Sequence, residues 1–180
     1  MNFFNKPNKC YKVTEEGKEI LIWNSRSVAV NCVIALVDEQ IGPCILVSKR
    51  GPNAADFQGK MNIVAGYLDW DESGTDAVYR ETWEECGVNV LQLLTDFKII
   101  RNDLFDPWSV KTFTDENRQN VSLRYGVIMS KKPSQTFPTL STEHNEIEGE
   151  VESPFWMPYH DIDNYEWAFK HDIVIKNYLH

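Results

Sequence analysis

Seven residues between positions 66 and 88 combine glycines, carboxylates and an arginine at fixed intervals. They occur in the run GYLDWDESGTDAVYRETWEECGV and follow the spacing Gly-x5-Glu-x7-Arg-Glu-x-x-Glu-Glu-x-Gly. With each residue type at about 6% usage, a chance match in a chain of this length has odds on the order of one in a million. Carboxylates gathered in this way can bind divalent cations and transfer protons. The seven residues are Gly66, Glu72, Arg80, Glu81, Glu84, Glu85 and Gly87.

The second half of this run predicts an amphipathic helix over about 74–86. At about 100° per residue, three of its carboxylates fall within one arc of roughly 100°, and we expect them to point outward. This carboxylate ridge consists of Glu81, Glu84 and Glu85. The opposite apolar arc is predicted to pack against a sheet, and it consists of Val78, Tyr79, Thr82, Trp83 and Cys86.

Both ends of the helix carry capping signals. Ser73 and Asp76 have the spacing of a capping box, and Gly87 is suited to a left-handed residue that ends the helix.

The carboxylate ridge needs a counter-charge, because like charges on adjacent turns repel by a few tenths of a kcal/mol per pair. Magnesium prefers oxygen ligands and is usually shared between a few carboxylates and substrate phosphates. The ridge therefore predicts a divalent cation and a phosphate-containing substrate. The alternative is a solvated acidic helix face, which explains most charge runs but not the accompanying glycines and arginine.

The seven residues resemble the signature of the Nudix hydrolases, enzymes that cleave a nucleoside diphosphate linked to another group. The resemblance covers about residues 26–175 and implies an α/β fold, an alpha/beta/alpha sandwich with a mixed β-sheet. Thr82 stands where the family pattern has an aliphatic residue, a departure that concerns packing. The implied cofactor is Mg²⁺, with Mn²⁺ able to substitute.

The resemblance also assigns roles in metal binding. It makes Glu81 and Glu85 the principal ligands, and Glu84 a ligand to a second or third ion. The backbone carbonyl of Ala65 would also face a metal. The implied reaction is attack by water on a phosphorus of a pyrophosphate linkage, with two or three metals sharing the work.

Two further signature residues take supporting roles under the same resemblance. Arg80 would orient the glutamates, and Glu72 would fix the joint between the loop and the helix.

The general base is either a ridge glutamate or one carried by a distant loop. We prefer Glu150, because GEVESPFWMP resembles an acidic run that the family often has six residues ahead of a tryptophan and a proline, here Trp156 and Pro158. A solvated acidic loop is the alternative for the other candidates, which are Glu143, Glu146, Glu148 and Glu152.

Residues outside the signature are candidates for substrate binding. Arg50, with Lys49, is placed to reach phosphates, or else is a solvated basic residue at a strand end. Phe105 and Trp108 lie in a long polar loop and are candidates to stack on a base, or else cover the edge of the sheet.

The leading substrate hypothesis is ADP-ribose or a similar dinucleotide or nucleotide sugar, cleaved to a nucleoside monophosphate and a phosphorylated partner. It depends on the Ala65-Gly66 entry to the signature, on Pro107, and on the run DENRQNVSLRY, which resembles ADP-ribose-cleaving relatives. The alternatives are a housecleaning (d)NTP pyrophosphohydrolase, hydrolysis of diadenosine polyphosphates or capped RNA, and a non-catalytic nucleotide sensor. Such sensors typically have a degraded signature, whereas every acid is present here. An isomerase of allylic diphosphates would need a cysteine and glutamate motif that the chain lacks.

Composition indicates one globular domain over residues 1–180. The formal charge of -9, without a cluster of basic residues, disfavours duplex nucleic acid and favours a small-molecule partner. The four cysteines form no Cys-x-x-Cys pair and are expected to be free thiols, with Cys86 in the core. No signal peptide or membrane span is predicted, so the expected compartment is the cytoplasm.

The remaining elements are predicted from apolar and β-branched runs. A polar loop is expected over 51–60, and His171 is expected to be a packed or capping histidine. Residues 1–18 match no pattern, which leaves open a role in covering the cleft or in forming a homodimer. The predicted strands are 19–23, 27–38, 44–50, 88–100 and 120–129, the short apolar segment 61–65 leads into the signature, and the predicted closing helix runs from Asp161 or Asp163 to Tyr178.

Overall fold

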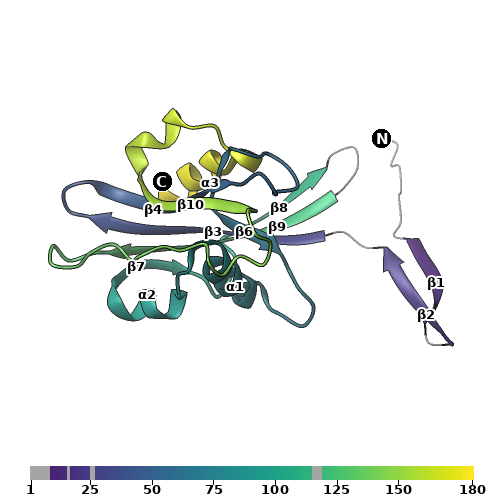
Figure 1. Ribbon diagram of the computed structural model, residues 1–180. Helices are drawn as coiled ribbons and strands as arrows, with labels where there is room; N and C mark the ends of the chain where they lie inside the picture. The colour runs from purple at the N-terminus through teal and green to yellow at the C-terminus, as the bar shows by residue number, and fades with distance from the viewer. Residues whose placement is uncertain (1–8, 16, 25–26, 115–118) are drawn as a thin grey trace, which may run out of the picture.

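The computed structural model describes residues 9–15, 17–24, 27–114 and 119–180. Among these residues, a mixed eight-stranded sheet carries helices on both faces, as Figure 1 shows. Its strands are β3 (Ser27–Asp38), β4 (Gly42–Arg50), β5 (Met61–Asn62), β6 (Val64–Tyr67), β7 (Lys98–Asp103), β8 (Ser109–Thr114), β9 (Gln119–Ser130) and β10 (Val151–Pro158). The helices are α1 (Gly74–Cys86), α2 (Val90–Asp96) and α3 (His171–Leu179). The predicted α/β sandwich with a mixed sheet is confirmed.

The central strands run in the order β10-β4-β3-β9-β7, with β5 beside β4, β6 beside β3 and β8 beside β9. β3 and β9 are parallel, and the other pairs are antiparallel. α1 and α2 cover one face of the sheet and α3 covers the other (Figure 1). One core cluster therefore lies on each face.

The helix α1 has the predicted limits. Ser73 accepts a hydrogen bond from the backbone N–H of Asp76, and the Asp76 side chain accepts one from the Ser73 backbone. Gly87 ends the helix with φ 67°, in the left-handed region. Ala77, Val78, Thr82 and Cys86 are buried beneath the sheet.

The prediction of a single strand over 88–100 was wrong. Asn89 accepts a hydrogen bond from the N–H of Gln92 and caps the short helix α2, after which β7 begins at Lys98. The long polar loop that follows contains an additional strand, β8. A short apolar run does not distinguish a buried strand from a buried helix, and here the cap determines the outcome.

The N-terminal strand 19–23 is confirmed as part of β2 (Lys18–Asn24), which pairs with β1 (Lys9–Glu15) in a separate two-stranded sheet. β1 was not predicted. The closing helix is shorter than expected, because two 3-10 helices, Tyr159–Asn164 and Ala168–Lys170, precede α3.

His171 is buried, and its Nδ1 accepts a hydrogen bond from the N–H of Ile63 at 3.3 Å. Burial, together with the charges of Arg124 and Arg50, lowers the pKa of His171 to about 3. The prediction of a packed histidine is confirmed.

This histidine should make the fold sensitive to acid. The folded-state pKa of about 3 lies below the ordinary value of 6.5, so the unfolded chain binds more protons between these values and the free energy of unfolding falls as pH falls from 6.5 toward 3. We expect His171→Gln, which keeps an acceptor for Ile63, to reduce this loss by up to about 1.4 kcal/mol per pH unit. Urea unfolding at pH 7, 6, 5 and 4 measures the free energy of unfolding of both proteins. If it falls equally with pH in the wild type and in His171→Gln, His171 is not the source of the acid sensitivity.

Candidate active site

The carboxylate ridge lies against β6, because α1 packs beneath that strand. Glu85 is only 6% exposed and accepts a hydrogen bond from the N–H of Ala65 at 3.3 Å. Glu81 and Glu84 are partly exposed. The expectation of an outward ridge was therefore wrong for Glu85, because the strand that leads into the signature folds back over the helix.

Glu81 occupies the space that a side chain at position 66 would need. A Cβ built on Gly66 would lie 1.9 Å from Oε1 of Glu81, far inside van der Waals contact. The signature requires glycine here because the carboxylate and the β6 backbone approach each other closely.

We expect Gly66→Ala to displace the Glu81 carboxylate and to reduce kcat by roughly 10- to 100-fold, because misplacement by about 1 Å has this effect on a reacting group. Steady-state kinetics beside circular dichroism would separate this effect from misfolding. A folded variant with wild-type kcat would show that the position of Glu81 does not matter.

Arg80 connects the ridge to the loop that precedes α1. Its Nη1 donates to Oε1 of Glu81 at 2.8 Å and to Oε2 of Glu84 at 3.1 Å. Its Nε and Nη2 donate to the Glu72 carboxylate at 3.1 and 2.8 Å. This contact lowers the pKa of Glu72 and raises the pKa of Arg80. The geometry is that of the orienting and joint-fixing roles predicted for Arg80 and Glu72.

Two additional contacts of Arg80 were not predicted. Its Nη2 donates to the carbonyl of Tyr67 at 3.0 Å, and Asp69 lies 3.6 Å from Nε. Both residues occupy unspecified positions of the signature, so the spacing contains no signal for them.

The site concentrates negative charge in a poorly solvated place. Burial raises the pKa of Glu81 to about 7, with Arg80 opposing the shift and Glu84 and Glu150 adding to it. Burial also raises the pKa of Glu85, and the charges of Glu81 and Glu150 add to this. A cation bound between the carboxylates of Glu81 and Glu85 would stabilise their charged form.

The loop that carries Glu150 is hydrogen-bonded to the residues that follow β4. The N–H of Gly51 donates to the Glu150 carbonyl at 2.7 Å, and the N–H of Asn53 donates to the Gly149 carbonyl at 3.0 Å. These bonds join the end of β4 to the segment before β10. Of the other candidates, Glu143, Glu146 and Glu148 are exposed, and Glu152 lies 4.0 Å from Lys49.

Arg50 is buried at 8% exposure, so the alternative of a solvated strand end was wrong. Its Nε donates to the backbone carbonyl of Asp56 at 2.8 Å, and its Nη2 donates to that residue's carboxylate at 3.0 Å. Its charge opposes the rise that burial causes in the pKa of Glu85.

The two candidate base-stacking residues differ in environment. The Trp108 indole packs on Tyr178, with ring centroids 5.3 Å apart, and donates to the Tyr125 carbonyl at 3.3 Å. Phe105 is largely exposed. Trp108 therefore has the contacts of the alternative role, a packing residue at the sheet.

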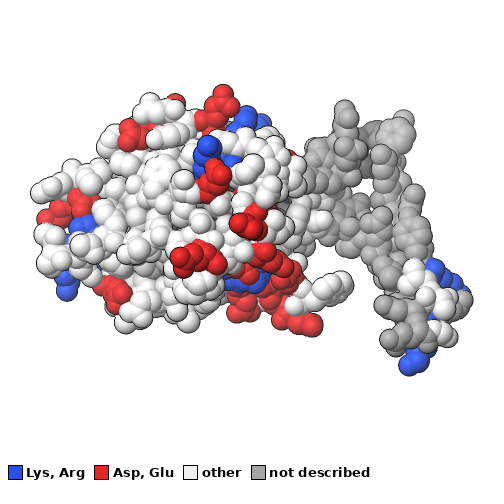
Figure 2. Space-filling model, viewed as in Figure 1, with Lys and Arg blue, Asp and Glu red and all other residues white. Residues whose placement is uncertain are grey.

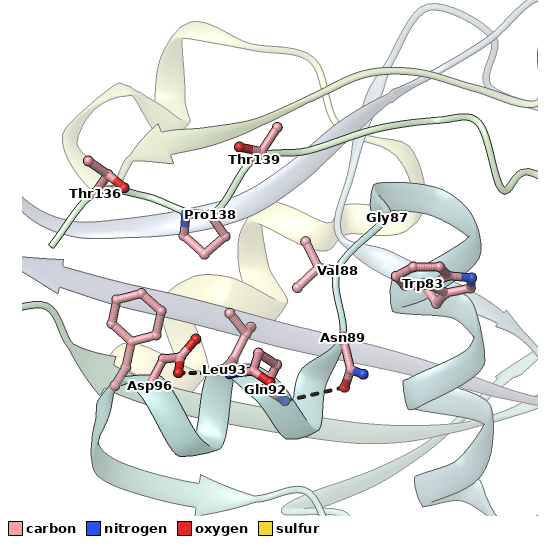
Figure 3. Close-up of a pocket in the computed structure, with 11 residues that line it drawn as sticks. Trp83, Gly87, Val88, Asn89, Gln92, Leu93, Asp96, Thr136, Pro138 and Thr139 are labelled. Atoms are coloured by element: carbon pink, nitrogen blue, oxygen red, sulfur yellow. Dashed lines mark hydrogen bonds between the residues drawn. The ribbon is translucent and has the colours of Figure 1, made fainter.

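Trp83 does not pack against the sheet as expected. It is 44% exposed and stacks on His144, with ring centroids 4.1 Å apart. Figure 3 shows Trp83 at a cavity between the end of α1, α2 and the loop that carries Pro138. This cavity does not include the ridge.

The donor chemistry of the ridge suits a hard divalent cation, because all its side-chain ligands are carboxylate oxygens. Glu81 and Glu85 also converge from α1 on the backbone of β6 at Gly66 and Ala65. In the described part of the chain, no three acidic, histidine or cysteine side chains already form a metal-binding group. Arg80 instead contacts one oxygen of Glu81 and one oxygen of Glu84, so these two bonds do not use the second oxygen of either carboxylate.

Acidic side chains gather over α1 and the loop before it, as Figure 2 shows. Cys32, Cys44 and Cys86 are buried free thiols, as expected for Cys86 in the core. Within the described ranges, no helix is long and apolar enough to cross a membrane.

Comparison with solved structures finds the same fold in three informative cases. The NUDIX domain of Shewanella oneidensis NrtR, complexed with ADP ribose, is 19% identical with a TM-score of 0.60, over 87% of this chain and 88% of that chain. A NUDIX hydrolase from Nitrosomonas europaea is 15% identical with a TM-score of 0.56, over 85% and 87%. A bifunctional NMN adenylyltransferase/ADP ribose pyrophosphatase from Francisella tularensis, complexed with AMP and a manganese ion, is 17% identical with a TM-score of 0.60, over 86% and 41%.

A comparison with curated protein sequences gave no match. The family model described as NUDIX domain matches residues 25–178, which is most of the chain. The chain therefore belongs to the NUDIX family and is a pyrophosphohydrolase by class.

Proposed function

We propose that this protein hydrolyses the pyrophosphate linkage of ADP-ribose or a similar dinucleotide or nucleotide sugar, with Mg²⁺ as cofactor. The observation that supports this most is the complete set of ridge carboxylates. Arg80 donates to Glu81 and Glu84, the N–H of Ala65 donates to Glu85, and Gly66 leaves the space that Glu81 occupies. A bound Mg²⁺ would activate water and neutralise charge on the phosphate oxygens.

The chain's own residues would divide the remaining work. Glu81, Glu84 and Glu85 would hold the cation, with the carbonyl of Ala65 facing it. Arg80 would keep two of these carboxylates in place through its fork of donors. Glu150 would accept the proton of the attacking water, and its charge adds to the rise in the pKa of Glu81 and of Glu85.

The preference for an ADP-ribose-type substrate has two supports. The sequence features around the signature resemble ADP-ribose-cleaving relatives, and two structures of the same fold contain ADP ribose or AMP. The buried free thiols suit a reducing compartment, so we place the protein in the cytoplasm.

A substrate panel tests this proposal. The purified full chain with Mg²⁺ is incubated with ADP-ribose, NADH, diadenosine polyphosphates, nucleotide sugars and NTPs, and the products are separated by chromatography. We expect AMP from ADP-ribose with the highest kcat/KM. Pyrophosphate released from NTPs at a higher kcat/KM would instead assign the protein to the housecleaning triphosphatases.

A further inference from the structure

Two aromatic side chains from distant parts of the chain meet at the surface. Phe57 lies in the loop 51–60 and Phe169 in the 3-10 helix before α3. Their ring centroids are 4.8 Å apart at an interplanar angle of 69°, so one ring presents its edge to the face of the other. They remain 42% and 38% exposed. We call these two rings the aromatic corner.

The backbone is strained at both rings. Phe57 has φ 52°, Phe169 has φ 53° and the adjacent Lys170 has φ 57°. Bulky residues rarely adopt this left-handed conformation. Strain of this kind persists only where the surroundings enforce it, and it concentrates at ligand-binding and catalytic sites. Of the five non-glycine residues with positive φ in the described ranges, two are thus the phenylalanines of the corner and a third is adjacent to one of them.

Cations lie over both rings. The buried Arg50 guanidinium lies 5.2 Å from the Phe169 centroid, which covers that ring from the protein side. Lys60 Nζ lies 5.8 Å from the Phe57 centroid and 3.4 Å from the Glu166 carboxylate. The corner therefore combines exposed ring surface with two cations that are each paired with a carboxylate, Arg50 with Asp56 and Lys60 with Glu166.

Arg50 and the loop 51–60 connect the corner with the segment that carries Glu150. Arg50 lies beneath Phe169, and its charge also reaches Glu85. At the start of the loop, Gly51 donates to the carbonyl of Glu150, the proposed base. The loop 51–60 thus contacts the segment of the proposed general base, Glu150, at one end and carries Phe57 near its other end.

We propose that the aromatic corner, Phe57 and Phe169, stacks on the nucleobase of the substrate while its diphosphate lies at the ridge. This inference rests on the proposed function. A planar base can stack on one ring and meet the edge of the other, and base stacking tolerates any π-face. A protein partner is a poorer occupant, because two rings offer far less than the roughly 800 Å² per partner of a standard interface.

Binding of AMP tests the corner without requiring cleavage. Calorimetry in the presence of Mg²⁺ measures the affinity of the full chain for AMP and for ribose 5-phosphate, which lacks the nucleobase. We expect Phe57→Leu and Phe169→Leu each to weaken AMP binding roughly 5- to 100-fold, while ribose 5-phosphate binding is unchanged. Phe113→Leu is the matched control, because Phe113 is also an exposed phenylalanine with an arginine over its ring, but lies on β8.

A second variant separates stacking from folding. Asparagine tolerates the left-handed conformation, so Phe57→Asn should keep or raise the Tm and still weaken AMP binding. Unchanged AMP affinity in both leucine variants would overturn the proposal. A loss of affinity for ribose 5-phosphate equal to the loss for AMP would also overturn it, because the variants would then affect binding of the phosphate and not of the nucleobase.

The experiments distinguish an error in the proposal about the aromatic corner from an error in the proposed function. If the wild type cleaves ADP-ribose and the phenylalanine variants keep its KM, the corner does not bind the base. If no compound of the panel is cleaved, the hydrolase proposal fails, while AMP binding still reports on the corner.

Discussion

Glu85→Gln is expected to reduce kcat by roughly 10³-fold or more, because it removes the charge from a principal ligand of the proposed metal site. The substitution preserves shape. The glutamine Oε1 can still accept the hydrogen bond that Glu85 receives from the N–H of Ala65. Initial rates of AMP release at saturating Mg²⁺ measure the effect. Retained activity in this variant would refute the assigned metal site.

The same variant should not lose stability in the absence of metal. The pKa of Glu85 is raised well above 4.5 in the fold, so the unfolded chain loses its proton first as pH rises and the wild type becomes less stable. Glu85→Gln lacks this penalty, and its Tm advantage over the wild type should grow from pH 5 to pH 8 in EDTA. Thermal unfolding measures the difference, with the exposed Glu143→Gln as control.

Glu150→Gln is expected to reduce kcat by about 10²- to 10⁴-fold at neutral pH with little change in KM, because it removes the proposed proton acceptor. The loop should keep its position, since the Glu150 backbone, not its side chain, accepts the bond from Gly51. Single-turnover rates with ADP-ribose measure the effect.

Glu148→Gln is the matched control for this prediction, because Glu148 is an exposed glutamate of the same loop. It should behave as wild type. Equal single-turnover rates in Glu150→Gln and Glu148→Gln would show that Glu150 is not the general base and would favour a ridge glutamate in that role.

The features that the sequence predicted well are those that depend on neighbouring residues. Ser73, Asp76 and Gly87 fix the ends of α1 through contacts within a few residues, and the helix has the predicted limits. The hairpin of β3 and β4 depends likewise on a tight turn, in which Asp38 pairs with Gly42. Glu150 was also chosen from a local run, and its role as the general base stays a prediction.

The features that were missed depend on distant parts of the chain. The helical pattern contains no information that β6 covers Glu85, or that His144 stacks on Trp83. Arg50 is buried because Asp56 and Phe169 enclose it, and Phe169 comes from the far end of the sequence. α2 was mistaken for part of a strand because its seven residues are too few to show a decisive period.

The most direct test of the proposed function is whether the full chain releases AMP from ADP-ribose. The reaction is run with Mg²⁺ and with EDTA, and chromatography measures the products. The proposed site predicts AMP and ribose 5-phosphate in equal amounts with Mg²⁺, and neither product in EDTA. Binding of ADP-ribose that raises the Tm without release of either product would contradict it and would identify the protein as a nucleotide sensor.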